Sequence, residues 1–205
     1  MAYASPVPSA PPVNVNIWHT ITFYCTGSVQ YWTVPSGVTS INFTVAGGGG
    51  GGGSVSTNVG AYASGGGGGS SAIEDITTNN FGAVSNGGIG GSCTNFNGQS
   101  GWIDSGSMSV KPGDKIAIWV GQGGSGGMAV TGGWITMSTG GVGGYGFSYG
   151  GSGWNYCWPV GGGGWGWWSQ WGNGGGAGGN SISSSNGGMG KSGSDGWVII
   201  KFISQ

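Results

Sequence analysis

The sequence predicts an all-β protein: one β-sandwich whose strands are joined by long glycine-rich insertions. Several segments alternate apolar and polar residues with a period of two, which is the pattern of a half-buried strand. Leucine is absent from the 205 residues and glycine supplies 55 of them, a composition that excludes a helical bundle. The chain also holds 12 tryptophans, 7 tyrosines and 6 phenylalanines, many more aromatic residues than a disordered chain carries.

Six segments carry the strand pattern clearly. In the first of them Ile17, Ile21 and the only histidine, His19, share the apolar parity, while threonines and asparagines occupy the other. The last segment is apolar on both parities, which predicts a central strand that is buried on both faces. Turn signals at Pro35 and Pro112 separate neighbouring strands. The predicted strands span 13–23, 29–34, 38–46, 107–111, 115–120 and 197–203.

The remaining residues divide into an arm and two insertions. Residues 1–12 are rich in proline and small residues, which predicts an extended arm. Residues 13–205 are predicted to form a single domain. Its glycine-rich insertions span about 47–106 and 121–196, and the first insertion contains two weak strand patterns, at 72–77 and 79–84.

Glycine is expected to build a structure of its own in these insertions, where residues 47–53 and 65–69 are uninterrupted glycine. A polyproline-II chain has three residues per turn and no internal hydrogen bonds, so its N–H and C=O groups point sideways. Segments that lack side chains can approach closely enough to bond to one another. Ordering each residue costs roughly 1–2 kcal/mol and each hydrogen bond returns about 0.5–1.5 kcal/mol, so buried aromatic rings must supply the remaining stability.

Charge and cysteine content exclude several classes of protein. The chain has no arginine, four lysines and a formal net charge of −1, so it lacks the basic patch that nucleic-acid binding requires. No apolar run approaches the 18 residues of a membrane-spanning helix, and the first residues lack the features of an ordinary signal peptide. Cys25, Cys93 and Cys157 show no metal-binding spacing, and whether any two of them pair stays open.

Three blocks of the sequence resemble the glycine-rich domains of bacteriophage tail-fibre and related virion proteins. The first block, at 32–46, reads WTVPSGVTSINFTVA and runs directly into glycine. The second, at 108–124, and the third, at 193–201, follow in the order that this family shows. The resemblance covers roughly residues 28–203. The same arrangement is similar to the glycine-rich extracellular domain of anaplastic lymphoma kinase.

The resemblance implies a jelly-roll sandwich, similar to tumour necrosis factor, with glycine helices inserted in its loops. It also implies a virion surface protein that assembles with other virion proteins and with sister chains. By analogy with jelly-roll fibre proteins, we expect a homo-oligomer and most plausibly a trimer. The tryptophan content and the proline-rich arm depart from the usual family member.

A tryptophan-rich stretch of the second insertion is the candidate binding site. Flat aromatic rings suit the C–H faces of sugars, and they are typical of hot spots in protein interfaces. These residues are therefore expected to bind a host-surface glycan or an outer-membrane protein. The alternative is that the rings cover the glycine layer and form a second core. The candidate residues are Trp154, Tyr156, Trp158, Trp165, Trp167, Trp168 and Trp171.

Catalytic and cofactor-binding groups are scarce. His19 lies on the apolar parity and is expected to be a hydrogen-bonded sheet residue. Glu74 and Asp75 would point to opposite faces of a strand, so we expect a solvated turn, or at most a weak Ca²⁺ site. Lys191 follows glycines as in a phosphate-binding loop, but Ser185 stands where that motif requires glycine. We predict no enzymatic activity, no cofactor and no metal.

The sequence thus predicts a non-enzymatic structural or adhesive protein on the surface of a virus particle. The sandwich and its arm would dock to the particle, and the glycine layer would display loops toward the host cell. Two alternatives stay open. One is a capsid decoration or cement protein without a receptor role. The other is a glycan-degrading tailspike enzyme, which would need two carboxylates about 5–9.5 Å apart.

Overall fold

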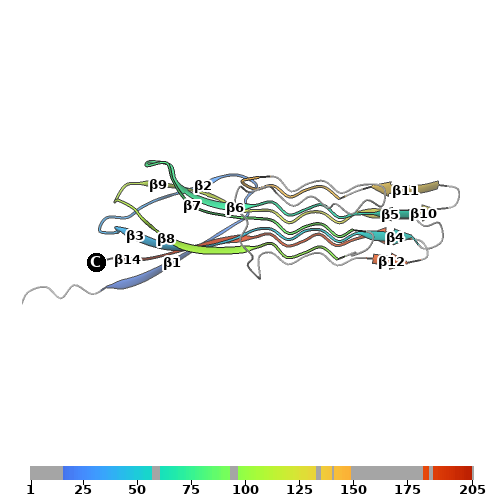
Figure 1. Ribbon diagram of the computed structural model, residues 1–205, viewed down its shortest axis with the longest axis horizontal. Helices are drawn as coiled ribbons and strands as arrows, with labels where there is room; N and C mark the ends of the chain where they lie inside the picture. Colours follow the sequence, from blue (N-terminus) through green and yellow to red (C-terminus); the bar gives the residue numbers. More distant parts are fainter. Residues whose placement is uncertain are drawn as a thin grey trace, which may run out of the picture.

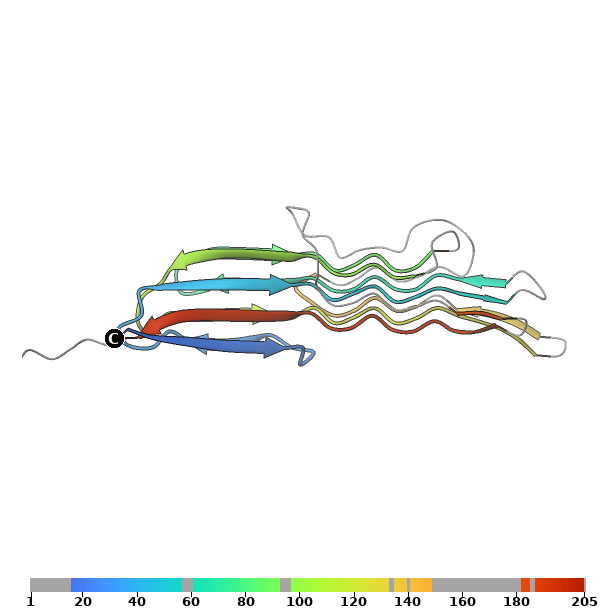
Figure 2. The same cartoon turned by 90° about the horizontal axis from the view of Figure 1, so that it is seen from below.

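The computed structural model describes residues 16–56, 61–92, 97–132, 135–139, 141–148, 182–184 and 187–204. These ranges contain strands, turns and extended segments but no helix, which confirms the all-β prediction. Figure 1 shows an elongated molecule with two sheets at one end, extended segments along the middle and short strands at the other end. Figure 2 shows the same succession of parts from below.

The near end of the molecule holds two four-stranded sheets, and all their strand pairs are antiparallel. Sheet A has the order β1 (Ile17–Tyr24), β14 (Trp197–Ser204), β3 (Ser40–Ala46) and β8 (Ile103–Ser109). Sheet B has the order β2 (Gln30–Thr33), β9 (Lys115–Trp119), β6 (Ser71–Asp75) and β7 (Asn80–Ser85). The weakly marked segments 72–77 and 79–84 thus supply half of sheet B.

One apolar core joins the two sheets. Alternate residues Ile41 and Val45 of β3 are buried in it, and so are Ile116 and Ile118 of β9. The ring of Phe202 in sheet A lies 5.3 Å from the ring of Trp32 in sheet B, measured between centroids. Full burial of each such side chain is worth roughly 1.5–3 kcal/mol. This arrangement is consistent with the predicted β-sandwich.

The last strand lies inside its sheet, as predicted, because β14 pairs with β1 on one side and with β3 on the other. The prediction that both of its faces are buried is wrong. Val198 and Ile200 are completely buried, but Ile199 is only half-buried and Lys201 is exposed. Ile199 and Lys201 lie on the outer face of sheet A. The neighbouring outward side chains of β3 and β8, such as Thr44, are short and polar, so they leave these two residues accessible to solvent.

The expectation of a solvated turn at Glu74 and Asp75 is wrong for Asp75. These two residues end β6, and Asp75 is completely buried. Its carboxylate accepts the backbone N–H of Thr77 at 2.9 Å and the hydroxyl hydrogen of Thr78 at 2.7 Å. A short acceptor side chain that bonds two or three residues ahead is typical of a turn, so Asp75 holds the connection from β6 to β7.

Seven extended segments form the middle of the molecule, and we call them the glycine bundle. They span 47–53, 64–70, 86–91, 97–102, 121–127, 141–148 and 190–196. Backbone hydrogen bonds connect each segment to several others, and the bonds to any one neighbour recur at every third residue. For example, Gly48 and Gly51 of the first segment donate to the second segment, at Gly69 and Gly66.

The first segment, 47–53, is the centre of the glycine bundle. Its N–H groups serve three neighbouring segments in rotation, because Gly47 donates to Trp102, Gly48 to Gly69 and Gly49 to Ser194. The next three residues repeat the order, with Gly50, Gly51 and Gly52 donating to Gln99, Gly66 and Lys191. Its carbonyl groups accept N–H groups from two further segments, 86–91 and 121–127. Five segments therefore surround this one.

This crowding explains the run of seven glycines. A Cβ atom added to Gly50 would overlap the carbonyl group of Ile89, and one added to Gly51 would overlap the carbonyl group of Ser125. Both obstacles are backbone atoms, which cannot rotate away. All residues of the central segment are buried.

The large side chains of the glycine bundle lie on its outside, whereas the small side chains of Ser64 and Ser70 are buried. Ile89 is exposed on the segment 86–91, and Val142 is exposed on the segment 141–148. Gln122 and Lys191 are exposed on two further segments. Each lies beside a buried glycine, so these four positions mark directions in which no other described segment lies.

Buried serines connect the sheets to the glycine bundle. Ser71 at the start of β6 donates its hydroxyl to the carbonyl of Ala46 at 2.6 Å and accepts the N–H of Gly121 at 2.8 Å. Ser85 at the end of β7 donates to the carbonyl of Trp102 at 2.6 Å. At these points the chain changes from ladders between paired strands to bonds at every third residue, and the Ser71 hydroxyl supplies the acceptor for the Gly121 N–H.

Short strands close the far end of the molecule. One three-stranded sheet has the order β12 (Ile182–Ser184), β4 (Ser54–Ser56) and β5 (Ala61–Ala63), with β12 parallel to β4. The other has the order β11 (Ile135–Thr139), β10 (Met128–Gly132) and β13 (Gly187–Met189). β4 and β10 directly continue segments of the glycine bundle, so the bundle connects the two ends of the molecule.

Candidate functional site

The seven aromatic residues that the sequence marked as a binding site lie within 149–181, outside the residues that the structure describes. The structure does describe the residues on either side of this range. Ser148 precedes it, at the end of the glycine bundle that adjoins the two four-stranded sheets. Ile182 follows it in β12, at the far end of the molecule. The prediction for Trp154, Tyr156, Trp158, Trp165, Trp167, Trp168 and Trp171 therefore stays a prediction.

Ser148 is held firmly at the sandwich end. Its backbone N–H donates to the hydroxyl oxygen of Ser70 at 2.7 Å, and its carbonyl accepts the backbone N–H of Ser70 at 3.1 Å. The preceding residue, Phe147, donates its N–H to the carbonyl of Ser70 at 2.9 Å. Three backbone groups around Ser70 thus fix the point from which the tryptophan-rich range begins.

An aromatic cluster surrounds this point. The ring of Phe147 lies 5.2 Å from the ring of Trp119 and 5.5 Å from the ring of Phe81, and both pairs meet edge to face. Phe81 is 47% exposed and Phe147 is 39% exposed. Edge-to-face pairs stabilise one another by about 0.5–1.5 kcal/mol beyond their buried area, so this is an ordered apolar surface in contact with solvent.

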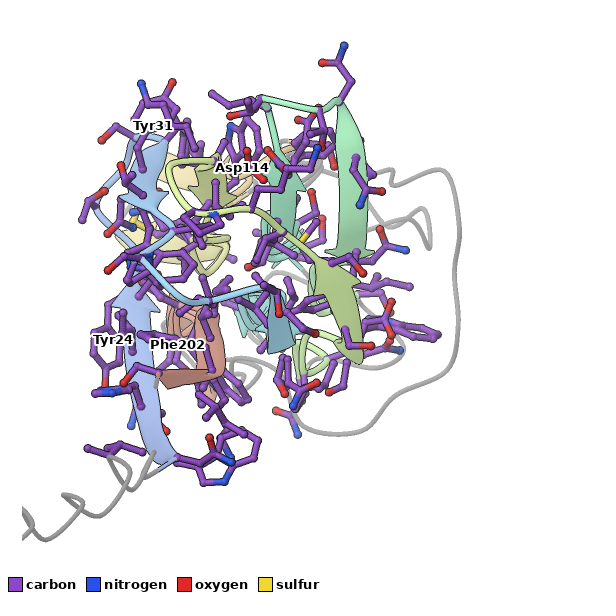
Figure 3. The ribbon with its side chains drawn as sticks, turned by 90° about the vertical axis from the view of Figure 1, so that its left-hand side faces the viewer. Tyr24, Tyr31, Asp114 and Phe202 are labelled. Atoms are coloured by element: carbon purple, nitrogen blue, oxygen red, sulfur yellow. The ribbon has the colours of Figure 1, made fainter. Side chains whose placement is uncertain are left out.

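The sequence analysis missed this cluster. Its members come from β7, β9 and a segment of the glycine bundle, and only the pairing of β6 with both strands brings Phe81 and Trp119 to the same region. The one signal in the sequence is the weak strand pattern at 79–84, which contains one aromatic residue, Phe81. A second aromatic contact lies on sheet B, where the ammonium group of Lys115 sits 4.0 Å from the ring centroid of Tyr31. Figure 3 shows Tyr31 and Tyr24 on the same side of the molecule.

His19 behaves as a sheet residue. It lies opposite Phe202 in the pairing of β1 with β14, and the two rings stack with 5.0 Å between their centroids. Its Nε2 atom is 2.8 Å from the hydroxyl of Ser204. Stacking and hydrogen bonding give the imidazole a structural role at the edge of the core.

The carboxylates of the described residues also serve the backbone. Asp114 accepts the N–H of Lys111 at 2.6 Å and closes the turn before β9. Asp195 accepts the N–H of Gly123 at 2.8 Å and joins two segments of the glycine bundle. Asp104 accepts the N–H of Ser105 at 2.8 Å. With Asp75, four of the five acidic residues are therefore occupied by bonds that hold the fold.

The sequence that imitates a phosphate-binding loop is part of the glycine bundle. Gly190 donates its N–H to the carbonyl of Gly127, and Gly193 donates to Gly124. The carbonyl of Lys191 accepts the N–H of Gly52. These backbone groups are occupied within the fold, so they do not form the open ring of N–H donors that a phosphate needs.

Cys25 is a free thiol at the end of β1. Partial burial raises the pKa of this thiol above its ordinary value, a hydrogen bond from the backbone of Gly27 lowers it, and the negative charge of Asp195 raises it. A raised pKa makes the thiol less reactive near neutral pH. Cys93 and Cys157 lie outside the described residues.

Among the described residues, no group of three or more histidine, cysteine, aspartate or glutamate side chains lies close enough to bind a metal ion together. The same residues contain no helix that is long and apolar enough to span a bilayer. The sequence matches no protein family and no curated protein.

Proposed function

We propose that the chain is a non-enzymatic structural and adhesive protein of a virus particle, a fibre or surface component that presents a stiff glycine and aromatic surface for attachment to a host cell. In this proposal the near end docks to other virion proteins and to sister chains, and the far end extends away from the particle. The ligand would be a surface glycan or an outer-membrane protein of the host.

The observation that carries the proposal is the glycine bundle. We take its segments to be polyproline-II helices, because the hydrogen bonds to any one neighbouring segment recur at every third residue and a polyproline-II helix has three residues per turn. We take the two sheets to be a jelly-roll sandwich with these helices inserted in its loops, as the family resemblance implies. The glycine bundle lies between the two ends of the molecule, so it is suited to holding one end at a distance from the other.

The proposal of a non-enzymatic role is supported by the state of the ionisable groups. Four of the five carboxylates accept backbone N–H groups, and His19 stacks on Phe202. A glycoside hydrolase needs two carboxyl groups that flank a bound sugar. The acidic side chains of the chain instead support separate turns and segments.

The proposed attachment surface consists of the seven aromatic residues within 149–181 together with the aromatic cluster from which that range begins. Phe81, Trp119 and Phe147 give an ordered and partly exposed set of rings at that point. Tryptophan and tyrosine are the residue types most enriched where binding energy concentrates.

A homo-oligomer, most plausibly a trimer, is part of the proposal. Strand β1 lies at the edge of sheet A and exposes Ile17 and Tyr24, at 53% and 68%. It contains no lysine, proline or bulge of the kind that normally protects an edge from pairing with another chain. Sedimentation equilibrium at micromolar concentration tests this part, and a stable monomer would contradict it.

Gold-labelled antibodies against the purified chain test the proposed function on virus particles from its source. Label at fibre tips or on the particle surface, together with adsorption of the purified chain to host cells, is the expected result. Label over the capsid without adsorption to cells would favour a decoration protein. Particles that carry no label would contradict the proposal.

A further inference from the structure

The outer face of sheet A is hollowed at the end that lies away from the glycine bundle. A trough of about 310 Å³ lies between the exposed ring of Trp18 and the side chains of β3 and β14. A second hollow of about 240 Å³ continues along the same face as far as Gly106. Asn42 and Lys201 line both hollows, so the two form one continuous groove. Its first part alone lies within the range of roughly 300–1,000 Å³ that small-ligand sites occupy.

Polar side chains without partners cross this groove. Lys201 of β14 lies directly between Thr20 of β1 and Asn42 of β3, and Asn42 lies opposite Ser107 of β8. Within the described part of the chain, neither Lys201 nor Asn42 forms a side-chain hydrogen bond or an ion pair. Other charged side chains hold the backbone, as those of Asp75 and Asp114 do. The row in the groove presents hydrogen-bonding groups to solvent instead.

Trp18 supplies an apolar wall beside these polar groups. It is 61% exposed and lies opposite Ile203, in the row of the sheet next to Lys201. A flat ring beside amide, hydroxyl and ammonium groups matches the chemistry of a sugar, which has an apolar C–H face and a rim of hydroxyls. Among the residues that the structure describes, Lys201 is the only charged one that lines either hollow. A ligand carboxylate would give this ammonium group the charged partner that the fold does not supply.

We propose that this groove binds an acidic oligosaccharide, with Trp18 stacking against a sugar ring, Lys201 pairing with a carboxylate and Asn42 bonding to hydroxyls. The site is separate from the aromatic residues of the proposed attachment surface, and it does not depend on them. Binding by the purified chain tests the groove, whereas labelling of particles tests the proposed function. Either one can fail without the other.

The test uses the purified full chain and a panel of oligosaccharides of galacturonic, glucuronic, mannuronic and sialic acid. Each is paired with the same oligosaccharide after reduction of its carboxyl groups to alcohols. Isothermal titration is expected to detect at least one acidic member and to show at least tenfold weaker binding of its neutral counterpart. Salt is expected to weaken the acidic binding, because a partly exposed ion pair is screened.

Two variants place the binding in the groove. Trp18→Ala and Lys201→Met are each expected to weaken it at least tenfold. Tyr31→Ala, which removes an exposed aromatic residue from sheet B, and Lys191→Met, which removes an exposed lysine from the glycine bundle, are expected to leave it unchanged. Thermal melting of all four variants shows that they are folded. The proposal is overturned if no acidic oligosaccharide binds, if neutral counterparts bind equally, or if folded Trp18→Ala and Lys201→Met variants bind as the unaltered chain does.

Discussion

The backbone N–H of Gly51 donates to the carbonyl of Gly66 at 2.8 Å, although 15 positions separate the two in sequence and neither has a side chain. Three residues earlier, Gly48 forms the equivalent bond with Gly69 at 3.0 Å. The two segments run antiparallel. Because glycine offers no apolar side chain to bury, this contact depends on backbone hydrogen bonds and on close packing of main-chain atoms.

A single methyl group at Gly90 is expected to destabilise the fold strongly. Its Cβ atom would overlap the carbonyl of Gly65 in the neighbouring segment, which is held in place by the hydrogen bonds of the Gly65 and Gly66 N–H groups. Overpacking of this kind typically costs about 1–3 kcal/mol or more. Urea unfolding of Gly90→Ala should therefore show a loss of at least about 2 kcal/mol.

The matched control is the adjacent residue. Ile89 is 41% exposed, so Ile89→Ala removes a side chain that leaves the glycine bundle toward solvent. Its unfolding free energy is expected to change by less than about 1 kcal/mol. If Gly90→Ala is as stable as Ile89→Ala, the segments are not in close contact.

Loss of the Ser71 hydroxyl is expected to weaken the connection between sandwich and glycine bundle. Ser71→Ala removes the partner of the Ala46 carbonyl and the partner of the Gly121 N–H, and both groups remain buried. An unpartnered buried polar group costs about 1–3 kcal/mol, so unfolding experiments should show a loss of at least about 2 kcal/mol. Ser107→Ala on the exposed face of β8 is the control and should cost less than about 0.5 kcal/mol. Equal effects of the two substitutions would mean that the buried hydroxyl is dispensable.

The strands could be predicted from the sequence because their side chains alternate. Ile41, Phe43 and Val45 lie in the core as their parity indicates, and Ile116 and Ile118 do the same on β9. The sequence patterns of β6 and β7 were weak, because the burial of these strands depends on neighbours that are distant in sequence. Gly82 of β7, for instance, is next to the core ring of Phe43, and this contact takes the place of a side chain of its own.

The candidate site could be predicted only in part. Rich aromatic composition drew attention to the range 149–181, which lies outside the described residues. The aromatic cluster could not be predicted from the sequence, because Phe81, Trp119 and Phe147 are brought together by strand pairing and by the hydrogen bonds around Ser70. The groove beside Trp18 could not be predicted, because the apolar pattern around Lys201 indicated a strand buried on both faces. The exposure of Lys201 depends on the absence of any described layer over that face of sheet A.

Stability is expected to fall in alkaline solution partly because of Cys25. Burial raises the pKa of this thiol, so the folded chain holds the thiol proton more tightly than the unfolded chain does. The resulting stabilisation is present below the pKa of the unfolded thiol and is lost as the pH rises through the pKa of the folded thiol. Urea midpoints of the unaltered chain should therefore fall more between about pH 8 and about pH 10.5 than those of Cys25→Ser. Parallel pH profiles of the two proteins would contradict this effect.

Hydrogen exchange of the glycine amides tests the central claim most directly, namely that main-chain hydrogen bonds between its segments hold the glycine bundle together. NMR-detected exchange resolves the amides of Gly48, Gly51, Gly66 and Gly69, each of which donates to a carbonyl of another segment. They are expected to exchange as slowly as the amides of β14 in the core of sheet A, because an amide must break its bond before it exchanges. Exchange at the rate of an unstructured peptide, while the amides of β14 remain protected, would contradict the claim.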